Sequence, residues 1–254
     1  MSFSGKVVLV TGASSGIGAA TAVMFCKEGA SVVLVARNEA KLKSVSEQCA
    51  AAGGKHALIK ADVSSDGDVK RIINSTIEKF SKLDILVNNA GIIAYGDILS
   101  GTILDTYDQI SKTNLRAVIH VTMLAAPHLV NSKGNIINIS SVASRMIVNK
   151  FSAYSTSKAG LDQFTRCAAA ELASSGVRVN SISPGPVDTD IFFNAGALPE
   201  FVARGIETPL GRVSQSDEIA DLILYLASDK AKGITGSNFV SDNGVLLQVF
   251  DNKK

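Results

Sequence analysis

Tyr154 and Lys158 are the residues of this sequence whose types and spacing best suit proton-transfer chemistry. If the chain from Phe151 onward is helical, their spacing of four places both side chains on one face, one turn apart. A tyrosine hydroxyl keeps its proton up to a pKa of about 10, and a nearby ammonium lowers that value. The pair then suits a general acid/base near neutral pH. The alternative is a packed tyrosine beside a solvated lysine, so the rest of the sequence must decide.

A glycine-rich stretch near the N-terminus stands where a phosphate-binding loop is expected. The apolar run Lys6–Thr11 predicts a buried strand, and a helical pattern reaches Glu28. Between them lies the sequence Gly12-Ala13-Ser14-Ser15-Gly16-Ile17-Gly18. Glycines let the backbone approach a pyrophosphate, and the N-terminus of a helix offers free N–H groups and a positive dipole end. An ordinary tight turn is the alternative, but strand, loop and helix together favour dinucleotide binding.

The residues after the second predicted strand, Ser31–Ala36, indicate which dinucleotide is bound. In a dinucleotide-binding fold, this position meets the adenosine ribose, and an acidic residue there would pair with both ribose hydroxyls of NAD. Here Arg37 and Asn38 follow the strand, and a guanidinium suits a 2′-phosphate. We therefore predict NADP(H), with NAD(H) as the alternative. A basic residue at Ser15 would have been a second partner of the phosphate, and a surface arginine is the other interpretation of Arg37.

Polar and small residues follow the next two predicted strands, at the edge where a doubly wound sheet binds its ligands. Strand 55–60 leads to Asp62, whose carboxylate would accept a hydrogen bond from an adenine amino group or else begin a turn with Ser64. Strand 83–87 leads to Asn88-Asn89-Ala90-Gly91, where small residues would let the backbone approach a flat ring.

Later elements bring further polar residues to the same edge. Strand 134–141 ends in Ser140 and Ser141, and Asn114 lies in an apolar helical stretch where it must find partners if buried. Pro127 should kink or end its helix locally. Helices are expected over 102–131, 151–174 and 216–227, a strand over 177–183, and extended chain over 235–240 and 245–249.

The stretch 188–215 has weak periodicity, and we expect it to be a substrate lid, because long insertions in compact domains are usually functional. No repeat or linker interrupts the sequence, so one domain over 1–254 is predicted.

Composition narrows the class of protein. With 254 residues and 46% hydrophobic residues, the chain can bury a large core. A net charge of +2 without a basic run gives no reason to expect nucleic acid as a partner. The three cysteines and three histidines are scattered, so no metal site is expected. No apolar run reaches about 18 residues, which argues against membrane insertion, and the absence of targeting signals predicts a cytoplasmic protein.

Together these motifs resemble the short-chain dehydrogenase/reductase family from Lys6 to about Gly244. The marks that carry the resemblance fall in the family's order: Thr11-Gly12-x-x-x-Gly16-x-Gly18, Asp62, Asn88-Asn89-Ala90-Gly91, Asn114, Ser141, Tyr154-x-x-x-Lys158 and Pro184-Gly185. The C-terminal Ser241-Asp242-Asn243-Gly244 departs from the family's Val-Asp-Gly-Gly. The resemblance implies an α/β, single-domain Rossmann fold with helices on both faces of a seven-stranded parallel sheet in the order 3-2-1-4-5-6-7. It also implies a homotetramer.

The resemblance assigns a role to each of four catalytic positions. Tyr154 would donate a proton to the carbonyl oxygen in reduction and accept one in oxidation. Lys158 would lower the pKa of Tyr154 and hold the ribose hydroxyls of the nicotinamide. Ser141, which matches the family's serine better than Ser140 by its distance from Tyr154, would hydrogen-bond the substrate oxygen. Asn114 would anchor a water that links Lys158 to solvent.

Cofactor and substrate positions also follow from the resemblance. Besides Tyr154 and Lys158, the predicted cofactor-binding residues are Gly12, Ser14, Ser15, Ile17, Gly18, Arg37, Asn38, Asp62, Val63, Asn89, Ala90, Gly91, Pro184, Gly185, Val187 and Thr189. The predicted substrate-facing residues are Ser141, Ile93, Val142, Met146, Ile147 and Phe192. Most of the latter are apolar, which favours a lipophilic ketone, aldehyde or alcohol such as a steroid-like, terpenoid or xenobiotic compound. A 3-oxoacyl thioester reductase and a non-catalytic NADP(H)-binding sensor or scaffold are the alternatives.

Overall fold

Seven parallel strands form one sheet in the order β3-β2-β1-β4-β5-β6-β7, which confirms the predicted topology. The computed structural model describes residues 2–99, 101–191 and 208–247. The strands are β1 (Val7–Thr11), β2 (Ser31–Ala36), β3 (His56–Lys60), β4 (Ile85–Asn88), β5 (Asn135–Ile139), β6 (Arg178–Pro184) and β7 (Asn238–Ser241). The strand order reverses between β1 and β4, and in such sheets the ligand site lies at that switch point.

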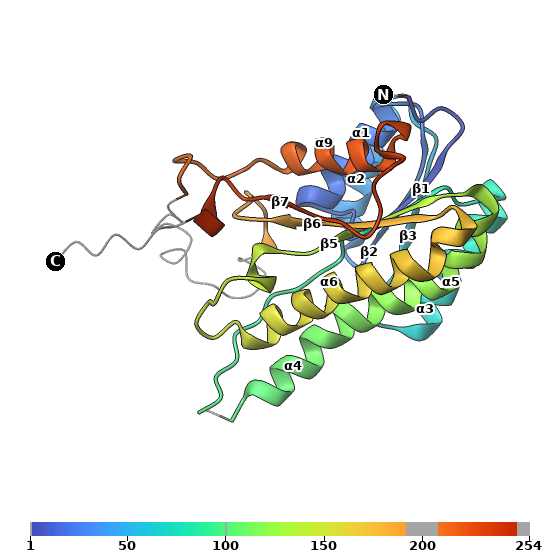
Figure 1. Cartoon of the computed structure of the whole chain (residues 1–254). Helices are drawn as coiled ribbons and strands as arrows, with labels where there is room; N and C mark the ends of the chain where they lie inside the picture. The colour runs from blue at the N-terminus through green and yellow to red at the C-terminus, as the bar shows by residue number, and fades with distance from the viewer. Residues whose placement is uncertain (1, 100, 192–207, 248–254) are drawn as a thin grey trace.

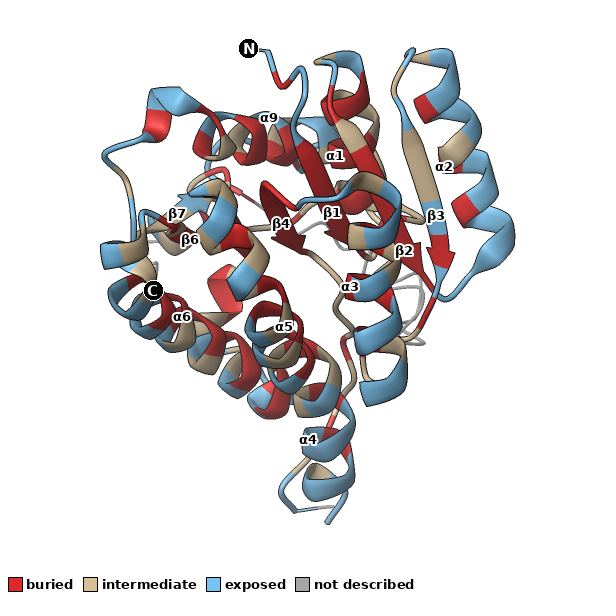
Figure 2. Cartoon of the chain, turned by 90° about the vertical axis from the view of Figure 1, so that its right-hand side faces the viewer, coloured by how far each residue is buried: buried red, intermediate tan, exposed pale blue. Residues whose placement is uncertain are grey.

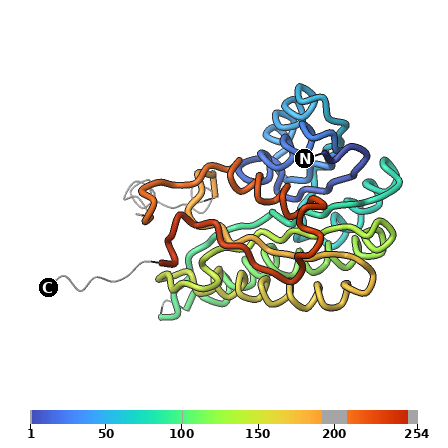
Figure 3. The backbone as a smooth tube through the Cα atoms, turned by 45° about the horizontal axis from the view of Figure 1, so that its top comes forward, coloured from blue at the N-terminus to red at the C-terminus, as the bar shows by residue number. Residues whose placement is uncertain are grey.

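Helices cover both faces of the sheet (Figure 1). On one face lie α1 (Gly16–Lys27), α2 (Glu39–Ala51) and α9 (Ser216–Ala227). On the other lie α3 (Asp66–Phe80), α4 (Ile103–Ser111), α5 (Ala117–Ser132) and α6 (Ser152–Leu172). Figure 3 shows the early, blue part of the chain gathered on one side of the molecule and the later, green to orange part beside it.

The alternation of side chains along each strand explains the continuous apolar runs of the sequence. In β1, Val8 and Val10 join the core cluster beneath α1 and α9, whereas Val7 and Leu9 join the cluster beneath α3 and α5. Successive side chains of a strand point to opposite faces, so a strand covered on both sides must be apolar throughout. Figure 2 shows the buried residues concentrated in the strands and on the helix faces turned towards them.

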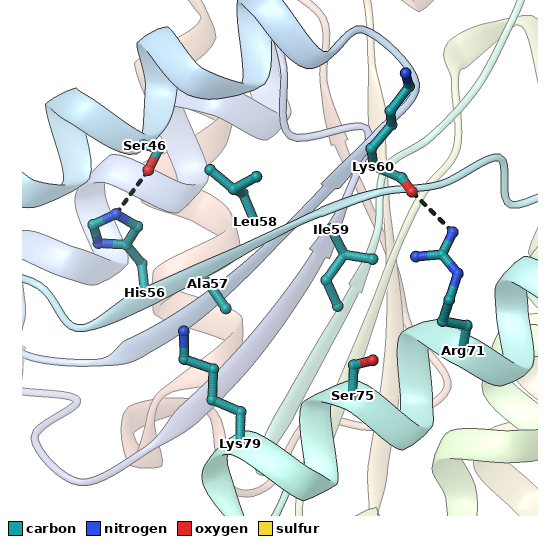
Figure 4. Close-up of a pocket in the computed structure, with 9 residues that line it drawn as sticks. All are labelled: Ser46, His56, Ala57, Leu58, Ile59, Lys60, Arg71, Ser75 and Lys79. Carbon is teal, nitrogen blue, oxygen red and sulfur yellow. Dashed lines mark hydrogen bonds between the residues drawn. The ribbon is translucent and has the colours of Figure 1, made fainter.

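Strand β3 forms an edge of the sheet, and long cationic side chains flank it. Arg71 of α3 donates a hydrogen bond to the carbonyl oxygen of Lys60 at 2.9 Å (Figure 4). Lys60, Arg71 and Lys79 border an open cleft of about 570 Å³ beside the strand. Charged side chains at an edge hinder pairing with a strand of another chain. We therefore interpret these side chains as protection of β3 against pairing with a strand of another chain.

The helical stretch that carries Asn114 is continuous. A π-helical turn over Lys112–Arg116 joins α4 to α5, so the two predicted segments run directly into one another. Helix α5 continues past Pro127 to Ser132, so the proline does not end the helix. Single π-helical turns inside α-helices occur frequently at functional sites.

The C-terminal end departs from the prediction. Val245–Leu247 is a 3-10 turn where extended chain was predicted for 245–249. Both side-chain oxygens of Asp242 explain the turn, because they accept the N–H groups of Gly244 at 2.9 Å and Leu246 at 2.8 Å. Of the predicted lid, residues 192–207 lie outside the described residues. Its flanks meet, because Asp188 N–H donates to the carbonyl of Ser214 at 2.9 Å.

Candidate active site

A cavity of about 690 Å³ lies at the carboxyl edge of the sheet and gathers the predicted site residues. The predicted cofactor residues that line it are Gly12, Ser14, Ser15, Ile17, Arg37, Asn38, Asp62, Val63, Asn89, Ala90, Gly91, Tyr154, Lys158, Pro184, Gly185, Val187 and Thr189. Most of them lie at or just after the ends of β1, β2, β3, β4 and β6, and Tyr154 and Lys158 come from α6, so the parallel strands bring together residues far apart in sequence. Gly18 lies beneath the loop and does not line the cavity.

Glycines let this loop pack closely against its own backbone and against the segment after β4. Gly12 has φ +67°, and a Cβ there would lie 2.8 Å from the Cα of Ala90. A Cβ on Gly18 would lie 2.3 Å from the carbonyl oxygen of Gly12. Asn89 Nδ2 fastens the loop by donating to the carbonyls of Thr11 at 3.0 Å and Gly12 at 3.1 Å. Helix α1 begins here without a side-chain cap from Ser15, so its first N–H groups suit a pyrophosphate.

The part of the cavity predicted to hold the adenosine carries two ion pairs. Arg37 Nη1 lies 3.9 Å from Asp62 Oδ2, and both side chains are more than one third exposed. Asp62 Oδ1 also accepts the N–H of Ser64 at 2.9 Å, so the turn considered in the sequence is formed while Asp62 still lines the cavity. Lys41 Nζ lies 2.5 Å from Asp190 Oδ2, and both residues line the cavity.

Lys41 and Asp190 were not predicted as site residues. Lys41 lies four residues after Arg37 at the start of α2, and that spacing was the available signal. Asp190 is 149 residues away in the sequence, and no local pattern connects it with Lys41. Gln109 and Thr113 also line the cavity from the helical stretch before Asn114, again at a spacing of four.

Three of the four predicted catalytic residues, Tyr154, Lys158 and Ser141, line the cavity together. Tyr154 and Lys158 lie one turn apart in α6 and are buried, with 7% and 4% of their surfaces exposed. Ser141 lines the same cavity, and its side chain acts to lower the pKa of Tyr154. The choice of Ser141 over Ser140 stays a prediction, but the geometry favours it. Ser140 is buried, and its Oγ donates to the backbone carbonyl of Lys158 at 3.4 Å.

The pKa of Tyr154 is raised, whereas the sequence predicted that Lys158 would lower it. Burial raises the pKa of Tyr154 to about 12, against the lowering effect of the Ser141 hydrogen bond. Burial lowers the pKa of Lys158 to about 8, against the raising effect of the negative charge of Asp162. Lys158 Nζ donates to the carbonyl of Ile139 at 2.8 Å and lies 5.8 Å from the centroid of the Tyr154 ring. Within the chain itself, desolvation therefore sets the direction of both shifts, and the expected lowering of the Tyr154 pKa does not appear.

Asn114 holds the backbone beside the catalytic pair. It is fully buried within the π-helical turn, where its Oδ1 accepts the Ile92 N–H and its Nδ2 donates to the Ile92 carbonyl, both at 2.9 Å. Nδ2 also lies 3.4 Å from Ser157 Oγ. The side chain is thus engaged by Ile92 and Ser157, and the anchoring of a water by Asn114 stays a prediction.

The predicted substrate residues separate into three groups. Ile93 and Ser141 line the cavity, and Ile93 packs in an apolar cluster with Phe151 and Tyr154. Val142 is buried, while the side chain of Ile147 is completely exposed. Among the described residues, Val142, Met146 and Ile147 do not line the cavity, and Phe192 lies outside the described part. Their contact with substrate stays a prediction.

Over 2–99, 101–191 and 208–247, no group of three histidine, cysteine, aspartate or glutamate residues is arranged to hold a metal ion. Within the same ranges, no helix has both the length and the apolar character needed to cross a membrane.

Comparison with known proteins adds independent observations. A family model described as enoyl-(acyl carrier protein) reductase matches residues 12–246. The 3-oxoacyl-[acyl-carrier-protein] reductase FabG of Thermotoga maritima is 34% identical over 97% of this chain and 100% of its own. A 3beta-hydroxysteroid dehydrogenase of Mediterraneibacter gnavus is 35% identical over 95% of each chain. The crystal structure of a short-chain dehydrogenase/reductase of unknown function from Caenorhabditis elegans, solved with cofactor, is 37% identical. It has a TM-score of 0.91 and covers 98% of this chain and 97% of its own.

Proposed function

Because this chain belongs to the short-chain dehydrogenase/reductase family, we propose that it is an NADP(H)-dependent oxidoreductase that interconverts a ketone or aldehyde and an alcohol. The observation that carries the proposal is that Tyr154, Lys158 one turn away and Ser141 all line one cavity, which Arg37 also lines. A bound nicotinamide would supply or take up the hydride in this reaction.

The chain's own residues would handle the proton. In reduction, the Tyr154 hydroxyl gives its proton to the carbonyl oxygen, and in oxidation the phenolate takes it back. Ser141 lines the cavity together with Tyr154 and would donate a hydrogen bond to the same substrate oxygen. Lys158 as an ammonium stabilises the phenolate that forms. Burial of Tyr154 and Lys158 excludes water, which strengthens these interactions.

The preference for NADP(H) rests on the cations at the adenosine end. Among the described residues that line the cavity, the cations are Arg37, Lys41 and Lys158, and the last belongs to the catalytic group. Arg37 is exposed and separated from Asp62 by 3.9 Å, so its guanidinium is accessible to a 2′-phosphate. NAD(H) is the alternative, since Asp62 and Asp190 partly offset these two positive charges.

A lipophilic substrate is favoured by the walls next to Tyr154. Ile92, Ile93 and Ile191 line the cavity and belong to or pack against the same apolar cluster as Tyr154. The described lining offers no cation beyond the three already named, so a small anionic substrate would lack a partner there. A 3-oxoacyl thioester is the alternative substrate, because the matched family model and the Thermotoga maritima relative are both named as acyl-carrier-protein reductases.

The test is consumption of NADPH and of NADH with a panel of four carbonyl compounds. The panel contains a steroid ketone, an isoprenoid aldehyde, an aromatic dione and an acetoacetyl thioester. We expect turnover of the apolar ketones with NADPH. Turnover of the thioester alone would favour the fatty-acid alternative, and bound NADPH without any turnover would favour a non-catalytic sensor or scaffold.

We also infer a homotetramer in the cytoplasm. The tetramer is supported by Ile119 and Met123, which lie one turn apart on α5 and are 40% and 59% exposed. Light scattering checks the mass. We expect that of four chains, and Met123→Glu should lower it; a wild-type mass of one chain contradicts the proposal.

A further inference from the structure

Helix α6 carries a third buried polar side chain in line with Tyr154 and Lys158. Asp162 follows Lys158 by one further turn, and only 8% of its surface is exposed. A carboxylate removed from water is costly unless it is hydrogen-bonded and faces a positive charge. The surroundings of Asp162 therefore bear on what it does beside the catalytic pair.

Neutral donors from two strands hold this carboxylate in place. Asp162 Oδ1 lies 3.0 Å from Asn238 Nδ2 of β7 and 3.4 Å from Ser181 Oγ of β6, and each of these groups donates to it. Asn238 is itself held, because Arg145 Nη2 donates to its Oδ1 at 2.6 Å. Arg145 lies just after the turn that begins at Ser141. The network thus fixes Asp162 from β6 and β7 and reaches the segment that carries the catalytic serine.

The buried cation one helical turn from Asp162 is Lys158. Among the other described cations nearby, Arg145 bonds to Asn238 and not to the carboxylate. Arg166, one turn further along α6, is exposed and bonds to Gln163. Lys158 is 4% exposed, and burial favours the loss of its proton. The negative charge of Asp162 opposes that loss.

We propose that Asp162 is a positioning residue whose carboxylate, held by Asn238 and Ser181, keeps the buried Lys158 in its ammonium form at neutral pH. Asp162 does not line the cavity and acts only through Lys158. What the ammonium then does for Tyr154 rests on the proposed function. The protonation of Lys158 itself does not, and it is measurable without any substrate.

The test is the pH titration of the Lys158 side-chain nitrogen by NMR, in protein labelled with ¹⁵N-lysine. The Lys158→Met variant assigns the resonance. In Asp162→Asn, we expect the midpoint to move down by about one pH unit, because the neutral amide no longer offsets desolvation. Glu171→Gln removes a carboxylate from an exposed position of the same helix and should leave the midpoint unchanged.

A second readout concerns catalysis. In carbonyl reduction, the midpoint of the decline of kcat at high pH should shift to lower pH in Asp162→Asn, together with the Lys158 midpoint. At a pH above the midpoints of both proteins, kcat of the variant should then be about tenfold below that of the wild type. A purely structural role would lower kcat evenly across pH. An active Asp162→Asn variant in which the high-pH decline of kcat keeps its wild-type midpoint would overturn the proposal.

The remaining outcomes are also decisive. An unmoved Lys158 midpoint in folded Asp162→Asn would overturn the inference. Should that variant fail to fold, the wild-type titration is sufficient, because an amine that is already neutral below pH 7 would equally refute it. A shifted midpoint in a protein that turns over no carbonyl compound would support the inference while rejecting the proposed function.

Discussion

The guanidinium of Arg37 lies 3.9 Å from the carboxylate of Asp62, where the segments after β2 and β3 meet in the cavity. An exposed ion pair at this separation contributes little to stability. A phosphate held by the same guanidinium through two parallel hydrogen bonds would be bound more strongly than Asp62 is, because bidentate charge-assisted hydrogen bonds are among the strongest in proteins. The pair therefore leaves Arg37 free to exchange one anionic partner for another.

Replacing Arg37 by aspartate should reverse the cofactor preference. We expect the Kd of NADPH to rise about 10- to 100-fold, because a hydrogen bond to a charged group contributes about 1.5–3 kcal/mol. The Kd of NADH should stay the same or fall, which calorimetric titration of both cofactors will show. Lys43→Asp is the matched control, since Lys43 lies on α2 outside the cavity and pairs with Glu39. An Arg37→Asp enzyme that still prefers NADPH would exclude Arg37 as the phosphate partner.

Tyr154→Phe should remove turnover while leaving cofactor binding nearly unchanged. The substitution deletes only the hydroxyl that Ser141 contacts, and loss of a general acid lowers kcat by about 10²- to 10⁴-fold. Steady-state kinetics and NADPH titration separate the two effects. Tyr225→Phe makes the same change on the exposed face of α9 and should not alter kcat. If Tyr154→Phe keeps its activity, another residue must supply the proton.

The same glycine-to-alanine change should have opposite effects in two helices. At Gly18, the new Cβ would meet the Gly12 carbonyl oxygen at 2.3 Å, so we expect a loss of about 1–3 kcal/mol in unfolding free energy. At Gly67, exposed in α3 with open space around it, alanine should add about 0.5–1 kcal/mol. Urea unfolding measures both. A stable Gly18→Ala variant that binds NADPH normally would show that the loop does not need this close approach.

Lys158 should leave a signature in the pH dependence of stability. Its pKa is lowered from 10.5 to about 8 by burial, so between these values the folded protein binds fewer protons than the unfolded chain. The free energy of unfolding contributed by this group therefore rises with pH across that window. Lys158→Met should lack the rise, and urea unfolding at a series of pH values in wild type and variant tests it. Parallel pH curves for the two proteins would mean that the amine titrates normally in the fold.

Residue spacing in the sequence was sufficient to predict the features that lie within a single helix or strand. The period of a helix places Tyr154 and Lys158 one turn apart, and apolar runs such as Val7–Thr11 indicate strands covered on both faces. The resemblance to a known family then supplied the strand order, which the structure confirms. The position of the glycine loop followed from its place between the first strand and the first helix.

Contacts between distant segments were decided by tertiary structure alone. The ion pair of Lys41 with Asp190 and the bond of Asp162 to Asn238 join residues 149 and 76 positions apart. Burial also set the pKa of Tyr154, because desolvation depends on everything packed around the hydroxyl and not on its neighbours in sequence. Sequence periodicity describes one helix or strand at a time, whereas the free energy of a buried charge depends on how all of these elements pack around it.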